Sequence, residues 1–264
     1  MILNVIIQCI IIVIVYFSFI YLLSRIDGRV DIVDTSFGIG FIVISIYFLI
    51  YNMLLNPGLP RKIIVTILVL IWGLRLSFHI YIRNKNKPSD RRYQEIISKW
   101  SSYIEIKKYI FLFLSQGIAV LLILSSVIFI NIESITSLGI FDFIGIFIWI
   151  LGFLFESISD SQLRKFISNS DNNGKIMTSG LWKYTRHPNY FGEITQWVGI
   201  FVIALSVKYG YIFVISPIVI YILLNYISGI PLIEKNYASK IGWEDYKRKT
   251  SRLLPLPQRN INKD

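Results

Sequence analysis

Residues 109–130 read YIFLFLSQGIAVLLILSSVIFI, an apolar run without a single charged side chain. A membrane-spanning helix needs about 20 predominantly apolar residues. Further segments of the same kind lie at 3–23, 30–51, 63–82, 138–155, 190–207 and 211–230. The sequence therefore predicts an all-α integral membrane protein, a seven-transmembrane-helix bundle that forms a single domain over residues 1–264.

The composition agrees with this fold class. Hydrophobic residues make up 54% of the chain and charged residues 16%, whereas soluble domains carry about 25% charged residues. The lone cysteine, Cys9, lies in an apolar run, which excludes an internal disulfide and a cysteine-based zinc site. Two histidines are too few for a histidine-rich site, so no metal is expected. The first apolar segment lacks a basic start and a clear cleavage site, which favours a helix over a signal peptide.

The basic residues are distributed unevenly between the two faces of the predicted bundle. Of the 27 Lys and Arg residues, 23 fall in the connections after the first, third and fifth predicted helices and in the tail 235–264. Cytoplasmic connections carry such an excess. The amino terminus is therefore predicted outside and the carboxyl terminus in the cytosol. Topology and contacts with anionic membrane lipids explain the net charge of +11, so no nucleic acid partner is expected. The membrane would be the endoplasmic reticulum in a eukaryote or the inner membrane in a bacterium.

Ionisable residues inside apolar segments are costly and indicate function. Asp31 and Asp34 open the second predicted helix, three residues apart and so on one face. Asp31 fits a helix cap equally well. Arg75, in the third predicted helix, suits either a pair with Asp34 or a phosphate contact. Glu156 and Asp160 would end the fifth helix against its dipole, with Arg164 one turn further on as compensation.

The polar stretch between the fifth and sixth predicted helices contains LWKYTRHPNYFGE at residues 181–193. Pro188 predicts a helix start. A helix amino end beside Arg186 and His187 is typical of an anion site. Asn189 and Glu193, four residues apart, share one face of that helix. The stretch therefore fits a phosphate-bearing cofactor, and an interfacial aromatic belt accounts equally well for Trp182, Lys183 and Tyr184.

Residues 180–193, GLWKYTRHPNYFGE, resemble the signature of the steroid 5-alpha-reductase-like membrane family, in its large and mostly uncharacterised branch. Other blocks resemble the family in the same order along the chain, at 34–40, 72–76, 90–93, 155–163, 228–234 and 246–255. The Arg-His-Pro-Asn-Tyr portion alone also resembles isoprenylcysteine and phospholipid methyltransferases.

This resemblance implies that the bundle binds NADPH near its cytosolic side and transfers hydride to the β-carbon of a lipid enone. An acidic or phenolic group would hydrogen-bond the carbonyl. The residues that match cofactor contacts or line the anion site are Asp160, Arg164, Tyr184, Arg186, His187, Asn189, Tyr190, Glu193, Glu234 and Tyr246.

The resemblance also implies a catalytic carboxylate on the second helix and a catalytic tyrosine on the third. Asp34 fits the first role. Trp72 stands at the tyrosine position, so Tyr93 in the adjoining loop is the expected substitute. Phe37 replaces the tryptophan usual in this branch. These departures weigh against a steroid as substrate.

Three functions follow as hypotheses. The first is an NADPH-dependent reductase of a carbon–carbon double bond in a hydrophobic enone or enoyl lipid. The second is a lipid or isoprenylcysteine methyltransferase that uses S-adenosylmethionine. The third, a transporter or scaffold, is disfavoured because the sequence has no internal repeat and its polar residues lie toward the predicted cytosolic face. Neither the substrate nor the oligomeric state is indicated.

Overall fold

The computed structural model describes residues 2–55, 60–85, 87–133 and 137–260, and these residues form two compact units. The first unit is Met1–Leu138 and the second is Gly139–Asp264. The last four residues of the predicted tail lie outside the described part. The single membrane domain stays a prediction.

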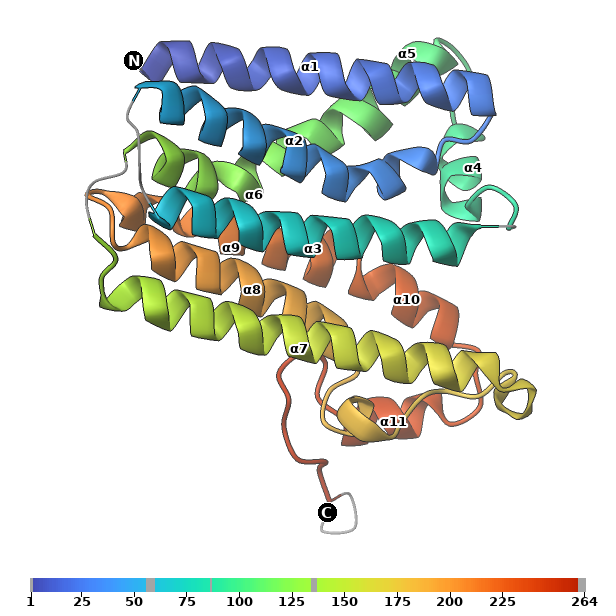
Figure 1. The fold of residues 1–264 in the computed structure, drawn as a ribbon. Coiled ribbons are helices and arrows are strands. Elements are labelled where there is room, and N and C mark those ends of the chain that lie inside the picture. Colours follow the sequence, from blue (N-terminus) through green and yellow to red (C-terminus); the bar gives the residue numbers. More distant parts are fainter. Residues whose placement is uncertain (1, 56–59, 86, 134–136, 261–264) are drawn as a thin grey trace. The chain divides into compact units, whose positions relative to one another are not determined.

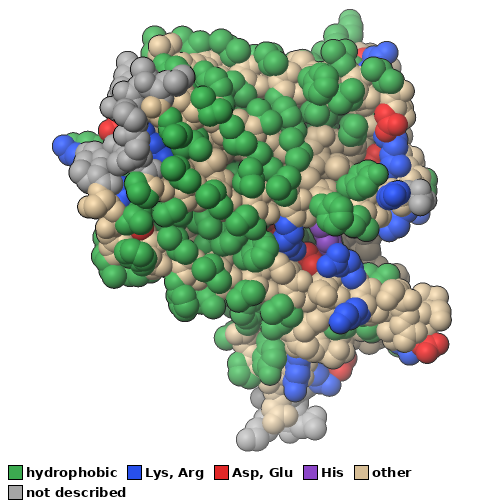
Figure 2. Space-filling model, in the orientation of Figure 1, with side chains coloured by type: hydrophobic (Ala, Val, Ile, Leu, Met, Phe, Trp, Pro, Cys, Tyr) green, Lys and Arg blue, Asp and Glu red, His purple; other side chains and the backbone are tan. Residues whose placement is uncertain are grey.

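Three long helices and one composite helix build the first unit (Figure 1). Its elements are α1 (Ile2–Asp27), α2 (Ile32–Leu55), α3 (Pro60–Asn84), α4 (Arg91–Ile97), α5 (Ile104–Lys108), a π-helical turn (Tyr109–Leu114) and α6 (Ser115–Ile132). Helix α2 packs against α1, α3 and α6. On the face drawn in Figure 2, hydrophobic side chains cover these helices along their length. Such a surface suits contact with lipid.

The second unit is also helical. Its elements are α7 (Ile140–Ser168), 3₁₀ turns (Ser170–Asn172, Gly180–Lys183 and Gly210–Val214), α8 (Pro188–Ala204), α9 (Ile215–Ile222), a π-helical turn (Leu223–Ile227), α10 (Ile230–Tyr237) and α11 (Trp243–Lys249). Helix α8 packs against α7 and α9. The described residues hold one isolated bridge, between Thr185 and Ser251, and no strand.

Glycines let α7 and α8 approach each other closely. A Cβ atom added to Gly152 would lie 2.6 Å from the carbonyl oxygen of Gly192, and one added to Gly145 would lie 2.5 Å from that of Gly199. The order of these contacts makes the two helices antiparallel. Small residues at such interfaces allow the close backbone approach on which helix packing in membranes depends.

Replacing Gly152 with leucine should therefore destabilise the second unit. The added side chain must separate the two helix backbones, and overpacking of this kind costs about 1–3 kcal/mol. Thermal unfolding of the detergent-purified protein measures the loss. Leu151→Phe adds volume to the same helix at a side chain that is 43% exposed, so it should leave the midpoint nearly unchanged. Equal shifts in both variants would contradict the packing argument.

Six described helical segments are long and apolar enough to cross a membrane: Leu3–Asp27, Ile32–Met53, Pro60–Asn84, Ile104–Ile132, Ile140–Ser168 and Gly210–Tyr237. The all-helical multi-pass architecture is thus confirmed. The remaining predicted span, 190–207, is the helix α8, which has 17 residues. At 1.5 Å per residue it reaches about 26 Å, short of a hydrocarbon core of about 30 Å. Seven spans and the orientation of the termini stay predictions.

One predicted helix end was wrong. The fifth helix was expected to end at residue 155, with Glu156 and Asp160 at its carboxyl end, but α7 continues to Ser168. The two carboxylates therefore lie within the helix rather than against the end of its dipole. Hydropathy marks the apolar part of a helix, and a helix can continue beyond that part on a polar sequence.

Candidate functional site

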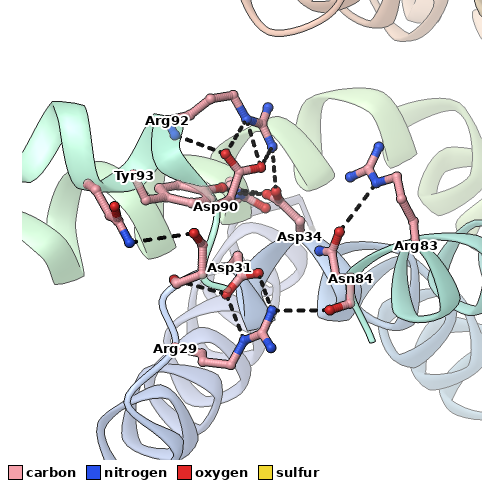
Figure 3. Close-up of polar contacts among 11 residues, drawn as sticks. Arg29, Asp31, Asp34, Arg83, Asn84, Asp90, Arg92 and Tyr93 are labelled. Carbon is pink, nitrogen blue, oxygen red and sulfur yellow. Dashed lines mark hydrogen bonds and ion pairs between the residues drawn. The ribbon is translucent and has the colours of Figure 1, made fainter. Parts of the chain in front are cut away.

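The two predicted catalytic residues meet in the first unit (Figure 3). Asp34 lies in the first turn of α2, and Tyr93 lies on the short helix α4. The Tyr93 hydroxyl donates a hydrogen bond to Asp34 Oδ1. Tyr93 is buried, with 8% of its surface exposed, whereas the Asp34 side chain is 17% exposed. The structure therefore brings the carboxylate and the phenol into direct contact.

Arg92 fixes the other oxygen of the carboxylate. Its Nη2 lies 3.0 Å from Asp34 Oδ2 and 2.7 Å from Asp90 Oδ2. Asp90 also caps α4, since its side chain accepts a hydrogen bond from the Arg92 backbone amide at 2.9 Å. An aspartate at this position satisfies an amide that the helix leaves unpaired. The cap and the ion pairs together set the position of Tyr93 relative to Asp34.

Gln116 is a further member of this cluster, and it was not predicted from the sequence. Its Nε2 lies 3.3 Å from Asp34 Oδ1 and 3.3 Å from the Tyr93 hydroxyl. The residue follows the π-helical turn Tyr109–Leu114, and such turns are frequent at functional sites. The signal was available, because Gln116 is an amide in the middle of an otherwise apolar run.

The environment of Tyr93 keeps its hydroxyl protonated. Burial raises the pKa of Tyr93 well above its ordinary value, and the negative charge of Asp34 raises it further. The phenol is thus a hydrogen-bond donor at every physiological pH. A neutral donor beside a fixed carboxylate can stabilise negative charge that develops on a nearby oxygen atom.

Asp31 is occupied by a structural ion pair. It precedes α2, and its carboxylate receives Arg29 Nη2 at 2.7 Å and Nε at 3.2 Å. Arg29 also donates to the carbonyl oxygen of Lys87 at 3.0 Å, which joins the α1–α2 and α3–α4 connections. The two aspartates that the sequence placed together therefore have different partners.

In the second unit, Arg186 and His187 share one carboxylate. Glu234 Oε1 accepts from Arg186 Nε at 2.9 Å and lies 3.1 Å from His187 Nε2. Arg186 Nη1 donates to the carbonyl oxygens of Lys247 at 3.0 Å and Thr250 at 2.7 Å. Arg186 is 7% exposed and His187 is 1% exposed. These contacts commit the guanidinium to internal partners and tie α8 to α10 and α11.

Three further hydrogen bonds hold the segment before α8 in place. The Tyr246 hydroxyl donates to the Trp182 carbonyl oxygen at 2.6 Å, and Trp182 Nε1 donates to the Ser159 carbonyl oxygen at 3.1 Å. Gln162 Oε1 accepts from the Leu181 backbone amide at 3.0 Å. Tyr246, expected at the cofactor, is therefore also a link between α11 and the loop.

The other predicted cofactor residues fall into two groups. Asp160 and Glu193 are buried on α7 and α8, and the Tyr190 ring stacks on His187 with centroids 5.8 Å apart. Asn189 differs because its Oδ1 is buried and has no hydrogen-bond partner among the described residues. The exposed residues are Arg164 and Tyr184.

Acidification should destabilise the second unit through His187. Burial lowers the pKa of His187 below its ordinary value of 6.5, with Glu234 opposing the shift. At low pH the imidazole therefore binds a proton more readily in the unfolded chain than in the folded one. The contribution of neutral His187 to the free energy of unfolding is fully present above about pH 6.5 and is lost as the pH falls below that value. Thermal midpoints between pH 5.5 and 8 should show this slope. His187→Gln should flatten it, and an unchanged slope in that variant would contradict the assignment.

Comparison with known proteins shows the family to which the chain belongs. A family described as "Protein of unknown function (DUF1295)" matches residues 20–250. The chain belongs to this family. Its members resemble steroid 5-alpha-reductases, and the resemblance seen in the sequence is confirmed at this level. The DUF1295 match covers both units of the structure.

Curated relatives of this DUF1295 protein match over shorter stretches. The chain is 38% identical to human 3-oxo-5-alpha-steroid 4-dehydrogenase 1 over 65 residues, and 33% identical to the bovine protein of that name over 61 residues. These matches span about a quarter of each chain. An uncharacterised Schizosaccharomyces pombe protein is 23% identical over 207 residues, 67% of this chain and 56% of that protein. No solved structure matches the chain significantly.

Proposed function

We propose that this protein is a membrane reductase that uses NADPH to reduce a carbon–carbon double bond conjugated to a carbonyl group in a hydrophobic lipid. The observation that carries the proposal is the Tyr93–Asp34 pair, a buried phenol held on a fixed carboxylate. The human and bovine relatives are named as dehydrogenases of 3-oxo-steroids, which are ketones. Long apolar helices suit a substrate that partitions into the bilayer.

Tyr93 is the proposed donor to the substrate's carbonyl oxygen. A hydroxyl can turn its single hydrogen from one acceptor to another. When the Tyr93 hydrogen turns toward a substrate oxygen, Asp34 keeps its bonds to Arg92 and Gln116. The carboxylate is therefore not left unpaired by the reaction. In this role Tyr93 stabilises the enolate oxygen that forms as the double bond is reduced.

The second unit offers groups that fit NADPH. Asn189 Oδ1 is a buried acceptor that finds no partner within the described residues, and the carboxamide of a nicotinamide carries a matching N–H donor. Arg164 is exposed and forms no ion pair within the described residues, so its charge suits a phosphate. When bound, NADPH would supply the hydride for the β-carbon of the double bond.

Arg186, Glu234 and Tyr246 have a positioning role in this proposal. Their hydrogen bonds end on one another and on backbone carbonyls of the second unit. They hold the loop 181–187, and with it the first turn of α8, which carries Asn189. A cofactor would thus bind to a preformed loop. Asp160 and Glu193 remain the carboxylates that we propose to contact the cofactor.

The test is an NADPH titration of the full-length protein in detergent, followed by the fluorescence of the reduced nicotinamide. Asn189→Ala should raise the Kd about tenfold, because it removes a buried polar contact worth about 1.4 kcal/mol. Asn173→Ala, in an exposed loop, is the matched control and should bind like the wild type. Failure of the wild type to bind NADPH, together with tight binding of S-adenosylmethionine, would sink the proposal in favour of a methyltransferase.

A further inference from the structure

A cavity of about 540 Å³ opens beside the carboxyl-terminal segment of the second unit. Its lining includes Lys183, Tyr184, Lys249, Gln258 and Arg259. Three of these side chains are cationic, and no residue of the lining is a carboxylate. The cavity therefore gathers positive charge around a space that can hold a group of several heavy atoms.

Hydrogen bonds of the terminal segment build this cavity. The Leu256 backbone amide donates to the Tyr184 carbonyl oxygen at 3.0 Å, and the Arg259 amide donates to the Lys249 carbonyl oxygen at 2.9 Å. Gln258 Nε2 donates to Thr250 Oγ1 at 3.1 Å. These bonds fold the chain back over the end of α11. Cations from three separate stretches of sequence are thus brought together by ordered backbone.

The charges of the cavity are only partly balanced. Lys249 Nζ pairs with Asp245 Oδ2 at 2.7 Å. The side chains of Lys183 and Arg259 form no hydrogen bond or ion pair within the described ranges. Like charges around one cavity repel each other, and an anion placed among them relieves that repulsion. The exposed Tyr184 hydroxyl adds a neutral donor beside them.

We infer that this cavity binds a phosphate group through Lys183 and Arg259, with Lys249 and the Tyr184 hydroxyl as further donors. A phosphate presents several acceptor oxygens and negative charge, and Arg and Lys are its usual partners in proteins. The phosphate could belong to a soluble nucleotide or to the headgroup of an anionic lipid, and both offer the same chemistry. The inference does not depend on the proposed reductase activity, because binding is measured without turnover.

The first experiment titrates the full-length protein, purified in an uncharged detergent, with inorganic pyrophosphate in a calorimeter. Saturable binding is expected, and it should weaken as salt is added. The double variant Lys183→Ala/Arg259→Ala should raise the Kd at least about tenfold, since two charge-assisted contacts are lost. Both side chains are exposed, so the variant should fold like the wild type.

Lys247→Ala is the matched control. Lys247 lies on α11, as Lys249 does, but it is a cation that does not line the cavity. It should leave the Kd within about twofold, as expected for an exposed charge. The inference is overturned if the wild type binds no pyrophosphate, if the double variant binds as well as the wild type, or if Lys247→Ala loses as much affinity as the double variant.

A second experiment distinguishes the two phosphate sources. Adenosine 2′,5′-bisphosphate is added as a competitor in detergent, and the pyrophosphate titration is repeated in nanodiscs of phosphatidylcholine with or without phosphatidic acid. Competition by the nucleotide supports a soluble phosphate ligand, and loss of pyrophosphate binding only with phosphatidic acid supports a lipid headgroup. If neither the nucleotide nor phosphatidic acid reduces pyrophosphate binding, the cavity takes neither kind of phosphate ligand, and the inference is overturned.

Discussion

Tyr93→Phe should lower the rate of double-bond reduction about 100- to 1000-fold, the loss seen when one donor to a developing oxyanion is removed. The variant keeps the buried ring and deletes only the hydroxyl that donates to Asp34. Turnover of a panel of enone lipids by the purified protein measures the effect. Affinity for NADPH should stay within about twofold, because Tyr93 is not among the proposed cofactor contacts.

Two further variants sharpen this result. Asp34→Asn keeps the size of the side chain but removes the charge that pairs with Arg92, so it should also reduce turnover strongly. Tyr103→Phe removes a hydroxyl from a side chain that is 75% exposed, and its activity should match the wild type. Wild-type turnover by Tyr93→Phe would exclude Tyr93 as the donor.

Arg186→Met should have the largest effect on stability, about 3–5 kcal/mol, which is typical when one partner of a buried ion pair is removed. The substitution leaves Glu234 without its guanidinium and removes the donors to the carbonyl oxygens of Lys247 and Thr250. Chemical unfolding in detergent, followed by tryptophan fluorescence, measures the loss. The protein should remain inserted in the membrane, since the long apolar helices are unaffected.

Arg248→Met is the matched control for this prediction. Arg248 lies on α11 and approaches Asp245 at 3.7 Å, with 65% of its side chain exposed. Exposed pairs contribute about 0–1 kcal/mol, so this variant should unfold close to the wild type. If both arginine variants lose the same stability, the buried network around Glu234 is not what holds the loop before α8.

The helical membrane architecture could be read from the sequence because apolar runs of spanning length are a direct consequence of the bilayer as solvent. What hydropathy could not show was where polar sequence continues a helix. Residues 156–168 extend α7 although they contain four charged side chains, and the π-helical turns interrupt apolar runs without any change in composition. Backbone pairing, rather than hydropathy, sets these features.

The residues of the candidate site could be predicted from the sequence to different degrees. Asp34 stood out as a carboxylate in an apolar helix, and Tyr93 followed from the family resemblance. The contact between them depends on the fold, because 59 residues separate them in the chain. The bond between Arg186 and Glu234 spans 48 residues, and no local pattern announces it. The sequence therefore identified polar side chains that are costly to place in apolar segments. Only the structure showed which of them already have hydrogen-bond or ion-pair partners within the protein.

The most direct test of the reductase proposal follows the transferred hydrogen. Membranes that contain the wild type or Tyr93→Phe are supplied with NADPH deuterated at both C4 positions of the nicotinamide, and the extracted lipids are examined by mass spectrometry. The proposal predicts one deuterium on a carbon of a lipid that has lost a double bond, and little or none with Tyr93→Phe. Absence of deuterium from wild-type lipids, with transfer of a labelled methyl group from S-adenosylmethionine to a lipid, would contradict it.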